Sequence, residues 1–203
     1  MGNKGQSSGK SGAGGGAKYR EVTDDSIFDK SVDKWTTDMS KSELNAAELY
    51  TGSAYYQWNE SLRTKDGKGW EVYTDNLDNA LSKFNLKENI VTYRGLGYGA
   101  MQDIFGSDSP DMKTIYGMKG AIISDKAFLS TSIDKNVARN FGGNYMFKIN
   151  IPKGKGRGAY VDSISKHSGE REFLMPRNTQ LKITGGYRDS STGMTVITVD
   201  YVT

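Results

Sequence analysis

Two glutamates stand one residue apart in the segment SGEREFLMP, directly before a run of apolar residues. If the segment is extended, Glu170 and Glu172 lie on the same side of the chain, about 6–7 Å apart, and Phe173, Leu174 and Met175 predict that the strand they enter is buried. Neighbouring carboxylates repel each other and resist removal from water. The position of this pair therefore needs a chemical explanation.

Two other predicted strands carry polar groups suited to ligand binding. Arg94 ends the apolar strand IVTYR, and a guanidinium forms two charged hydrogen bonds with phosphate oxygens. In FLSTS, Ser130 and Ser132 share one face of the strand and Thr131 points to the other. Each pattern alone is common in ordinary strands. Together they form a set of one arginine, a hydroxyl triplet and two acids.

The elements that must position this set change character along the chain. Helical spacing of apolar residues prevails between Thr23 and Asn85, with one helix starting at Ser42. After Asn89 the apolar period becomes two, which is typical of strands. The expected strands cover residues 90–94, 128–132, 145–151, 172–174, 181–184 and 194–202, with a short helix over 132–139 and a turn at 97–99. Helices followed by strands predict an α+β domain.

Composition limits the remaining possibilities. Residues 1–17 form a Gly/Ser/Lys-rich leader that we expect to be disordered, and residues 18–203 are long enough for one domain. Four of the 27 Lys and Arg lie in residues 1–20 without any acid, so the rest holds 23 basic and 24 acidic residues. A nearly neutral body argues against nucleic-acid binding. No apolar run suits a membrane helix and no classical signal peptide is visible. The chain has no cysteine and one histidine, which excludes a multi-histidine or cysteine metal site.

The order of three motifs resembles a known family. TYRGL, then FLSTS with Phe141 eleven residues past Ser130, then EREFLMPRNTQLKI, are similar to the Arg–Ser–Glu class of mono-ADP-ribosyltransferases, over roughly residues 40–202. Its best-known members are bacterial toxins, including the enzyme components of clostridial binary toxins. The resemblance implies two packed, mostly antiparallel sheets with N-terminal helices, NAD as substrate, and no metal. The domain over 18–203 would then be an ADP-ribosyltransferase catalytic domain.

The resemblance implies roles for the residues at the sugar and pyrophosphate. Arg94, next to Gly95, would hold the pyrophosphate. Glu172 would stabilise the oxocarbenium-like ribose and hold a ribose hydroxyl. Ser130 would hydrogen-bond to Glu172 and fix its rotamer.

Five further residues match the cofactor side of the family's site less specifically. Thr131 and Ser132 would support the strand or the nicotinamide pocket. Phe141 would pack on nicotinamide, with a core helix aromatic as the alternative. Tyr55 and Asn59 match helical positions that face NAD in relatives, and a core role is the alternative for the tyrosine.

The residue type that accepts ADP-ribose is predicted from the first glutamate, Glu170. In the family a glutamate at position 170 accompanies arginine acceptors, and we expect Glu170 to orient a guanidinium and take its proton. The two acids are then explained, because one meets charge on the sugar and the other meets charge on the target. Three residues before Glu170, where the family often has an aromatic residue, stands His167, which we expect to contact the target or solvent.

The expected function is therefore transfer of ADP-ribose to an arginine of a target protein, with NAD hydrolysis as a side reaction. This function fits a bacterial toxin or effector that is secreted or injected into a host. Actin is one candidate target. An immunity or delivery protein is an additional candidate partner. A phage-encoded enzyme acting on bacterial proteins, in a phage particle or the cytoplasm, is the alternative. A nucleic-acid modifier and a catalytically inactive binding module of the same fold are rival classes.

Overall fold

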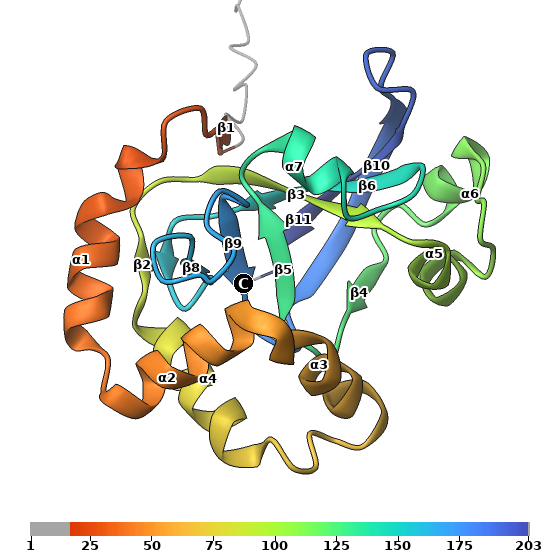
Figure 1. Cartoon of the computed structure of the whole chain (residues 1–203). Helices are drawn as coiled ribbons and strands as arrows, with labels where there is room; N and C mark the ends of the chain where they lie inside the picture. Colours follow the sequence, from red (N-terminus) through yellow and green to blue (C-terminus); the bar gives the residue numbers. More distant parts are fainter. Residues whose placement is uncertain (1–16, 203) are drawn as a thin grey trace, which may run out of the picture.

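The computed structural model describes residues 17–202, so nearly all of the predicted leader, residues 1–16, lies outside the described residues. Helices dominate the first part of the chain and strands the second (Figure 1). The helices are α1 (Asp29–Asp38), α2 (Lys41–Leu49), α3 (Tyr55–Thr64), α4 (Glu71–Lys83), α5 (Tyr98–Phe105), α6 (Met112–Gly117) and α7 (Lys135–Arg139), with shorter helical turns η1 (Asp25–Phe28) and η2 (Tyr50–Ala54). The strands are β1 (Arg20–Glu21), β2 (Asn85–Leu86), β3 (Ile90–Leu96), β4 (Ile122–Ser124), β5 (Leu129–Ser132), β6 (Tyr145–Ile151), β7 (Gly154–Lys155), β8 (Ala159–Tyr160), β9 (Glu172–Met175), β10 (Gln180–Arg188) and β11 (Thr195–Tyr201).

The strands form one long hydrogen-bonded path and one small sheet. The path runs β4-β10-β11-β6-β3-β5-β9-β8, with β1 beside β3, and β2 pairs with β7. Only β11–β6 and β1–β3 are parallel in this described set. The single residue pair Tyr93–Ser132 joins β3 to β5, so the two halves of the path meet at a narrow junction. The predicted α+β fold, mostly antiparallel with N-terminal helices, is confirmed.

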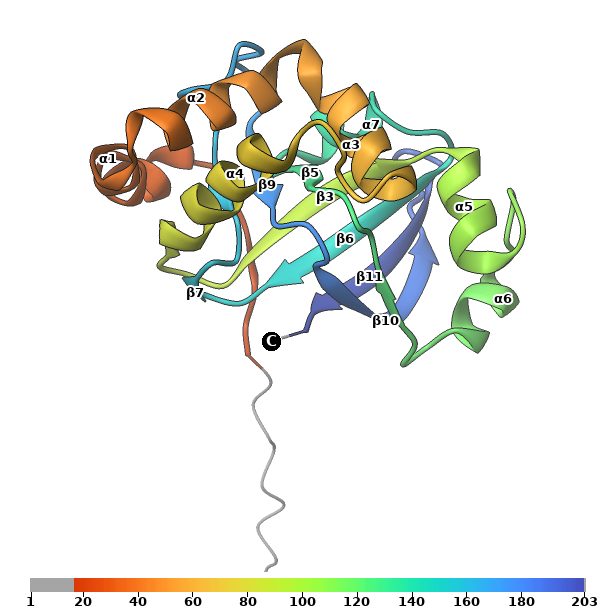
Figure 2. The same ribbon diagram turned by 90° about the horizontal axis from the view of Figure 1, so that it is seen from below.

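The N-terminal helices form a layer over the strands. Figure 2 shows α1 to α4 above β3, β6 and β11, with α5 and α6 at the far end of the sheet. Trp35 on α1 and Trp58 on α3 are almost completely buried in the core between these layers. The layer also places α3 beside the start of β5, at the end of that strand away from its junction with β3 (Figure 1).

Local chemistry sets where the predicted helices begin. The helix expected from Ser42 starts at Lys41, because Ser40 and Glu43 form a reciprocal capping box. The short helix expected from Ser132 starts at Lys135, because the Asp134 carboxylate accepts a hydrogen bond from the Asn136 N–H and caps it there.

Two expectations around Gly95 were wrong. The strand does not end at this glycine, because β3 pairs with β6 as far as Leu96–Tyr145. The segment read as a turn at 97–99 starts α5, with Gly97 as its N-cap and Met101 buried. Gly95 has a packing role instead: a Cβ here would lie 2.7 Å from the backbone nitrogen of Gly142, so glycine permits this close contact.

Candidate active site

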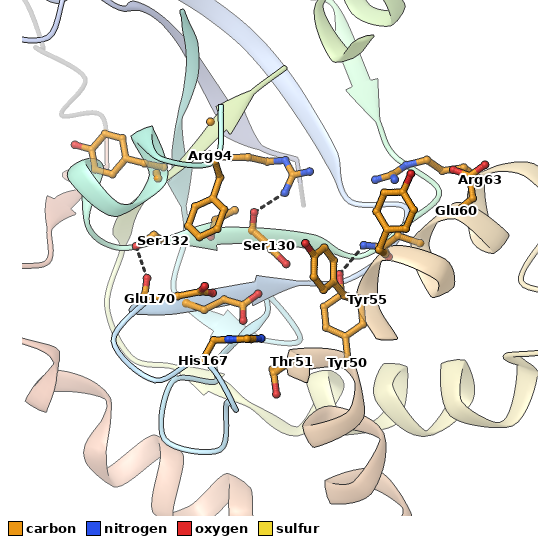
Figure 3. A pocket seen from close by; sticks show the side chains of 18 residues that line it. Tyr50, Thr51, Tyr55, Glu60, Arg63, Arg94, Ser130, Ser132, His167 and Glu170 are labelled. Carbon is orange, nitrogen blue, oxygen red and sulfur yellow. Dashed lines mark hydrogen bonds between the residues drawn. The ribbon is translucent and has the colours of Figure 1, made fainter. Parts of the chain in front are cut away.

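A cavity of about 410 Å³ opens where β3, β5, β9 and α3 converge (Figure 3). All eleven residues that the sequence singled out line it: Tyr55, Asn59, Arg94, Gly95, Ser130, Thr131, Ser132, Phe141, His167, Glu170 and Glu172. They are spread over more than 110 positions of the chain, and the fold brings them together at the junction of the two halves of the sheet. The size is typical of a pocket for a small organic molecule.

Glu172 is a buried carboxylate at the wall of this cavity. Glu172 is the first residue of β9 and pairs with Ser132 of β5. It is only 7% exposed. Burial raises the pKa of Glu172 to about 7, and the negative charge of Glu170 raises it as well. Hydrogen bonding from the Ser130 hydroxyl and the positive charge of Arg94 oppose this rise. The ionised form of Glu172 is therefore held at a substantial desolvation cost.

Arg94 lines the same cavity as Glu172. Its Nη1 donates a hydrogen bond to the backbone oxygen of Ser130, at 2.6 Å (Figure 3). Burial lowers the pKa of this guanidinium from its ordinary value, although arginine stays charged. Within residues 17–202 no carboxylate forms an ion pair with Arg94. Its remaining donors are consequently available to an anionic ligand.

The helical side of the cavity is braced by a buried tyrosine. The Asn59 side-chain nitrogen donates to the hydroxyl of Tyr50, at 2.8 Å, and this hydroxyl donates to the backbone oxygen of Phe128, at 3.4 Å. Burial raises the pKa of Tyr50 to about 12. The side-chain oxygen of Asn59 is buried without a hydrogen-bond partner among the described residues. Through Tyr50 of η2, Asn59 thus links α3 to Phe128, the residue directly before β5, and keeps one acceptor beside the cavity. Tyr55 lines the same cavity and is half exposed.

The turn before β9 carries the other glutamate. The Ser132 hydroxyl donates to the backbone oxygen of Glu170, at 2.8 Å (Figure 3). Glu170 is half-buried and His167 is exposed, and both side chains border the cavity on the side away from Arg94. Thr131 points to the opposite face of β5, where its hydroxyl donates to the backbone of Phe173. Ser132 and Thr131 therefore fasten the glutamate-bearing segment to β5.

Phe141 lies at the rim of the cavity rather than in the core. It follows the end of α7 and is 62% exposed, so the alternative reading as a core helix aromatic was wrong. The backbones of Gly142 and Gly95 are in close contact, which sets the distance between this loop and β3. A large exposed aromatic ring at a cavity rim is suited to stacking on a flat ligand.

Sequence reasoning missed seven lining residues: Tyr50, Thr51, Tyr56, Glu60, Arg63, Tyr93 and Ala138. The most informative is Arg63, which adds a second guanidinium and forms a two-pronged ion pair with Asp125, at 3.0 and 2.6 Å. Arg63 lies four residues after Asn59, so helical spacing alone could have placed both on one face.

Two features of the described residues bear on metal cofactors and on membranes. Within residues 17–202, no group of three or more His, Asp or Glu side chains is arranged to hold a metal ion. No helix in the described part of the chain has the length and apolar character that crossing a bilayer requires.

Residues 26–203 match the family model described as ADP-ribosyltransferase exoenzyme. The chain is 33% identical over 177 residues to NAD(+)–arginine ADP-ribosyltransferase EFV of Enterococcus faecalis, covering 81% of this chain but only 33% of that protein. It is 31% identical over 175 residues to mono-ADP-ribosyltransferase C3 of a Clostridium botulinum D phage, covering 78% of this chain and 68% of the relative. The solved structure of C3stau2 from S. aureus with NAD superposes with a TM-score of 0.76 at 20% identity, over 92% of this chain and 99% of that one.

Proposed function

Since the chain belongs to the ADP-ribosyltransferase exoenzyme family, we propose that it transfers ADP-ribose from NAD to an arginine side chain of a target protein. The observation that carries this proposal is the pairing of the buried Glu172 with Glu170 at one cavity that also holds Arg94. The relative from Enterococcus, whose name specifies arginine as acceptor, supports the choice of acceptor.

The cavity has groups that fit the parts of NAD. The free donors of Arg94 suit the pyrophosphate oxygens, and Arg63 adds positive charge on the other side. Phe141 at the rim suits the flat nicotinamide ring, and the unpaired side-chain oxygen of Asn59 suits a hydroxyl or amide donor. Both arginines would recognise the phosphates through their guanidinium groups.

Glu172 performs the central step by stabilising positive charge. The bond between nicotinamide and the ribose carbon breaks, its electron pair leaves with nicotinamide, and the ribose becomes cationic. The Glu172 carboxylate, fixed by Ser130 and buried in a low-dielectric wall, lowers the energy of that cation. Glu172 acts in its ionised form, so binding of a cationic ligand beside it favours the active state.

Glu170 completes the transfer. A guanidinium nitrogen of the target attacks the ribose carbon from the open side of the cavity, and the proton that this nitrogen loses passes to the Glu170 carboxylate. The half-buried position of Glu170 at the cavity's border allows contact with a group arriving from solvent. Water attacking in place of the guanidinium gives NAD hydrolysis, which depends on Glu172 but not on Glu170.

The test compares Glu172→Gln and Glu170→Gln in one preparation. Loss of a preorganised charge typically lowers a rate by about 10²–10³-fold, so Glu172→Gln should lose both hydrolysis and transfer by about that factor. Glu170→Gln should lose transfer to arginine, or to agmatine as a small guanidine, and keep most of the hydrolysis. Melting temperatures establish that both variants are folded. Arginine transfer by Glu170→Gln at the wild-type rate would refute the acceptor assignment.

The biological setting is a toxin or effector that acts on proteins of another cell, with actin among the candidate targets. The family's description as an exoenzyme supports this setting, and the C3 relative of a phage supports a phage-borne gene. Treatment of host and bacterial lysates with labelled NAD, followed by mass spectrometry of modified residues, separates a eukaryotic from a bacterial target. Label in nucleic acid instead of protein would favour the rival nucleic-acid modifier, and no label at all the inactive binding module.

A further inference from the structure

The two glutamates of the cavity are anchored in different ways. Glu172 belongs to β9, which pairs with β5 on one side and β8 on the other. Its backbone oxygen also accepts a hydrogen bond from the Val161 N–H, at 3.0 Å. Glu172 is thus held by sheet pairing from both neighbours. Glu170 lies two residues earlier, outside the strand, and has no such pairing.

The turn that carries Glu170 has an unfavourable backbone. Gly169 has a φ of 95° and Arg171 a φ of 50°, so both neighbours of Glu170 lie in the left-handed region. Glycine adopts this region readily, but arginine does so rarely and only where its surroundings hold it. Arg171 therefore needs an interaction that offsets the strain.

Asp162 provides the interaction that also reaches Gly169, whereas the other contacts of Arg171 are with Thr23, Asp25, Ile133 and Asp134. The Asp162 Oδ1 accepts hydrogen bonds from the backbone N–H of Arg171, at 2.7 Å, and of Gly169, at 3.1 Å. One carboxylate oxygen thus binds the backbone of the turn on both sides of Glu170. Hydrogen bonds to an ionised acceptor are stronger than neutral ones. Asp162 does not line the cavity and cannot act on a substrate there directly.

From these contacts we infer that Asp162 is a positioning residue for the acceptor step: it fixes the turn on which Glu170 stands and so sets the direction of that carboxylate. This inference rests on the proposed role of Glu170. It separates the two activities, because Glu172 keeps its sheet anchors when Asp162 is lost. Misplacement of a reacting group by about 1 Å can lower a rate by about 100-fold.

The expected result for Asp162→Ala is a loss of transfer to agmatine of about ten-fold or more, with NAD hydrolysis reduced by less than about three-fold. Asp162→Asn should restore most of the transfer, because a single oxygen at the Oδ1 position can accept both hydrogen bonds. A merely structural role would lower both activities together and would not give this rescue. Ser165→Ala is the matched control: it removes a hydrogen bond to the His167 N–H in the same loop and should leave the ratio of the activities unchanged.

Gly169→Ala tests the inference independently if Asp162→Ala folds poorly. A Cβ at position 169 meets no atom within 4 Å, but the φ of 95° strains any residue other than glycine, so the turn should shift and transfer should again fall selectively. Equal loss of hydrolysis and transfer in folded variants, or unchanged transfer in Asp162→Ala and Gly169→Ala, would overturn the role of Asp162. Glu170→Gln is measured alongside. If it keeps full transfer, the proposed function fails; if it loses transfer while Asp162→Ala keeps it, only the role of Asp162 fails.

Discussion

Replacement of Glu172 by glutamine should lower the catalytic rate by about 10²–10³-fold and stabilise the fold at alkaline pH. Burial raises the pKa of Glu172 from 4.5 to about 7. Between these values the folded protein binds the proton more tightly than the unfolded chain does, so stability falls as the pH rises. The penalty is absent below about pH 4 and complete above about pH 8. Glutamine carries no charge at any of these values and escapes the penalty.

The magnitude follows from the interval between the two pKa values. At 1.4 kcal/mol per unit, ionisation of Glu172 destabilises the folded state by about 3 kcal/mol. For a domain of this size, 1 kcal/mol changes the melting temperature by about 2–4 °C. Glu172→Gln should therefore melt about 6–12 °C above the wild type at about pH 8, and at nearly the same temperature at about pH 4.

The assay is thermal unfolding of the ligand-free protein across this pH range. Glu60→Gln is the control, because Glu60 borders the same cavity but is exposed to solvent. The difference in melting temperature between Glu60→Gln and the wild type should not increase with pH. A difference between Glu172→Gln and the wild type that is the same at about pH 4 and about pH 8 would refute the reasoning. So would a pH-dependent difference of equal size in Glu60→Gln.

Three further predictions concern NAD and the fold. Arg94→Ala should weaken NAD affinity measured by calorimetry by about ten-fold or more, whereas unchanged affinity would contradict the pyrophosphate role; activity should be insensitive to a chelator. Gly142→Ala places a Cβ 2.5 Å from the backbone nitrogen of Leu96 and should lower both melting temperature and NAD affinity, while Gly143→Ala, 3.6 Å from its nearest neighbour, should change neither. A truncation that starts at Lys18 should keep hydrolysis within a few-fold, and one that starts at Thr23 should unfold more easily, because it removes the buried Val22.

The strands that carry the site could be predicted because their patterns are local. The strand at Tyr145–Ile151 has the predicted bounds, since apolar alternation defines its faces and Pro152 ends its pairing. The α5 helix was missed because its first residues, Gly97 to Gly99, have the composition of a turn. Only the tertiary structure shows that Met101 is buried and that Gly97 serves as an N-cap.

The candidate site was predictable where a residue has its own chemistry and not where it acts through a neighbour. Arg94, Ser130 and Glu172 are found from residue type and motif. Asp162 was missed because its contact with Arg171 spans nine positions and leaves no motif. Arg63 shares a helix face with Asn59, but its contact with Asp125 spans 62 positions and is not visible in the sequence. An aspartate that accepts two backbone N–H groups cannot be distinguished, in the sequence alone, from one that is exposed to water.

The burial of Glu172 explains both why its ionisation destabilises the folded protein and why its charge is proposed to stabilise the cationic ribose strongly. A carboxylate that remained in water would keep an ordinary pKa, but solvent would screen its effect on the cationic ribose. In the wall of the cavity the charge is costly to form, and for that reason its attraction to a neighbouring cation is strong. Arg94 and Ser130 offset only part of the cost. The rest of the desolvation cost is offset when positive charge develops on the substrate beside Glu172. The ionised carboxylate therefore destabilises the ligand-free fold but stabilises the transition state.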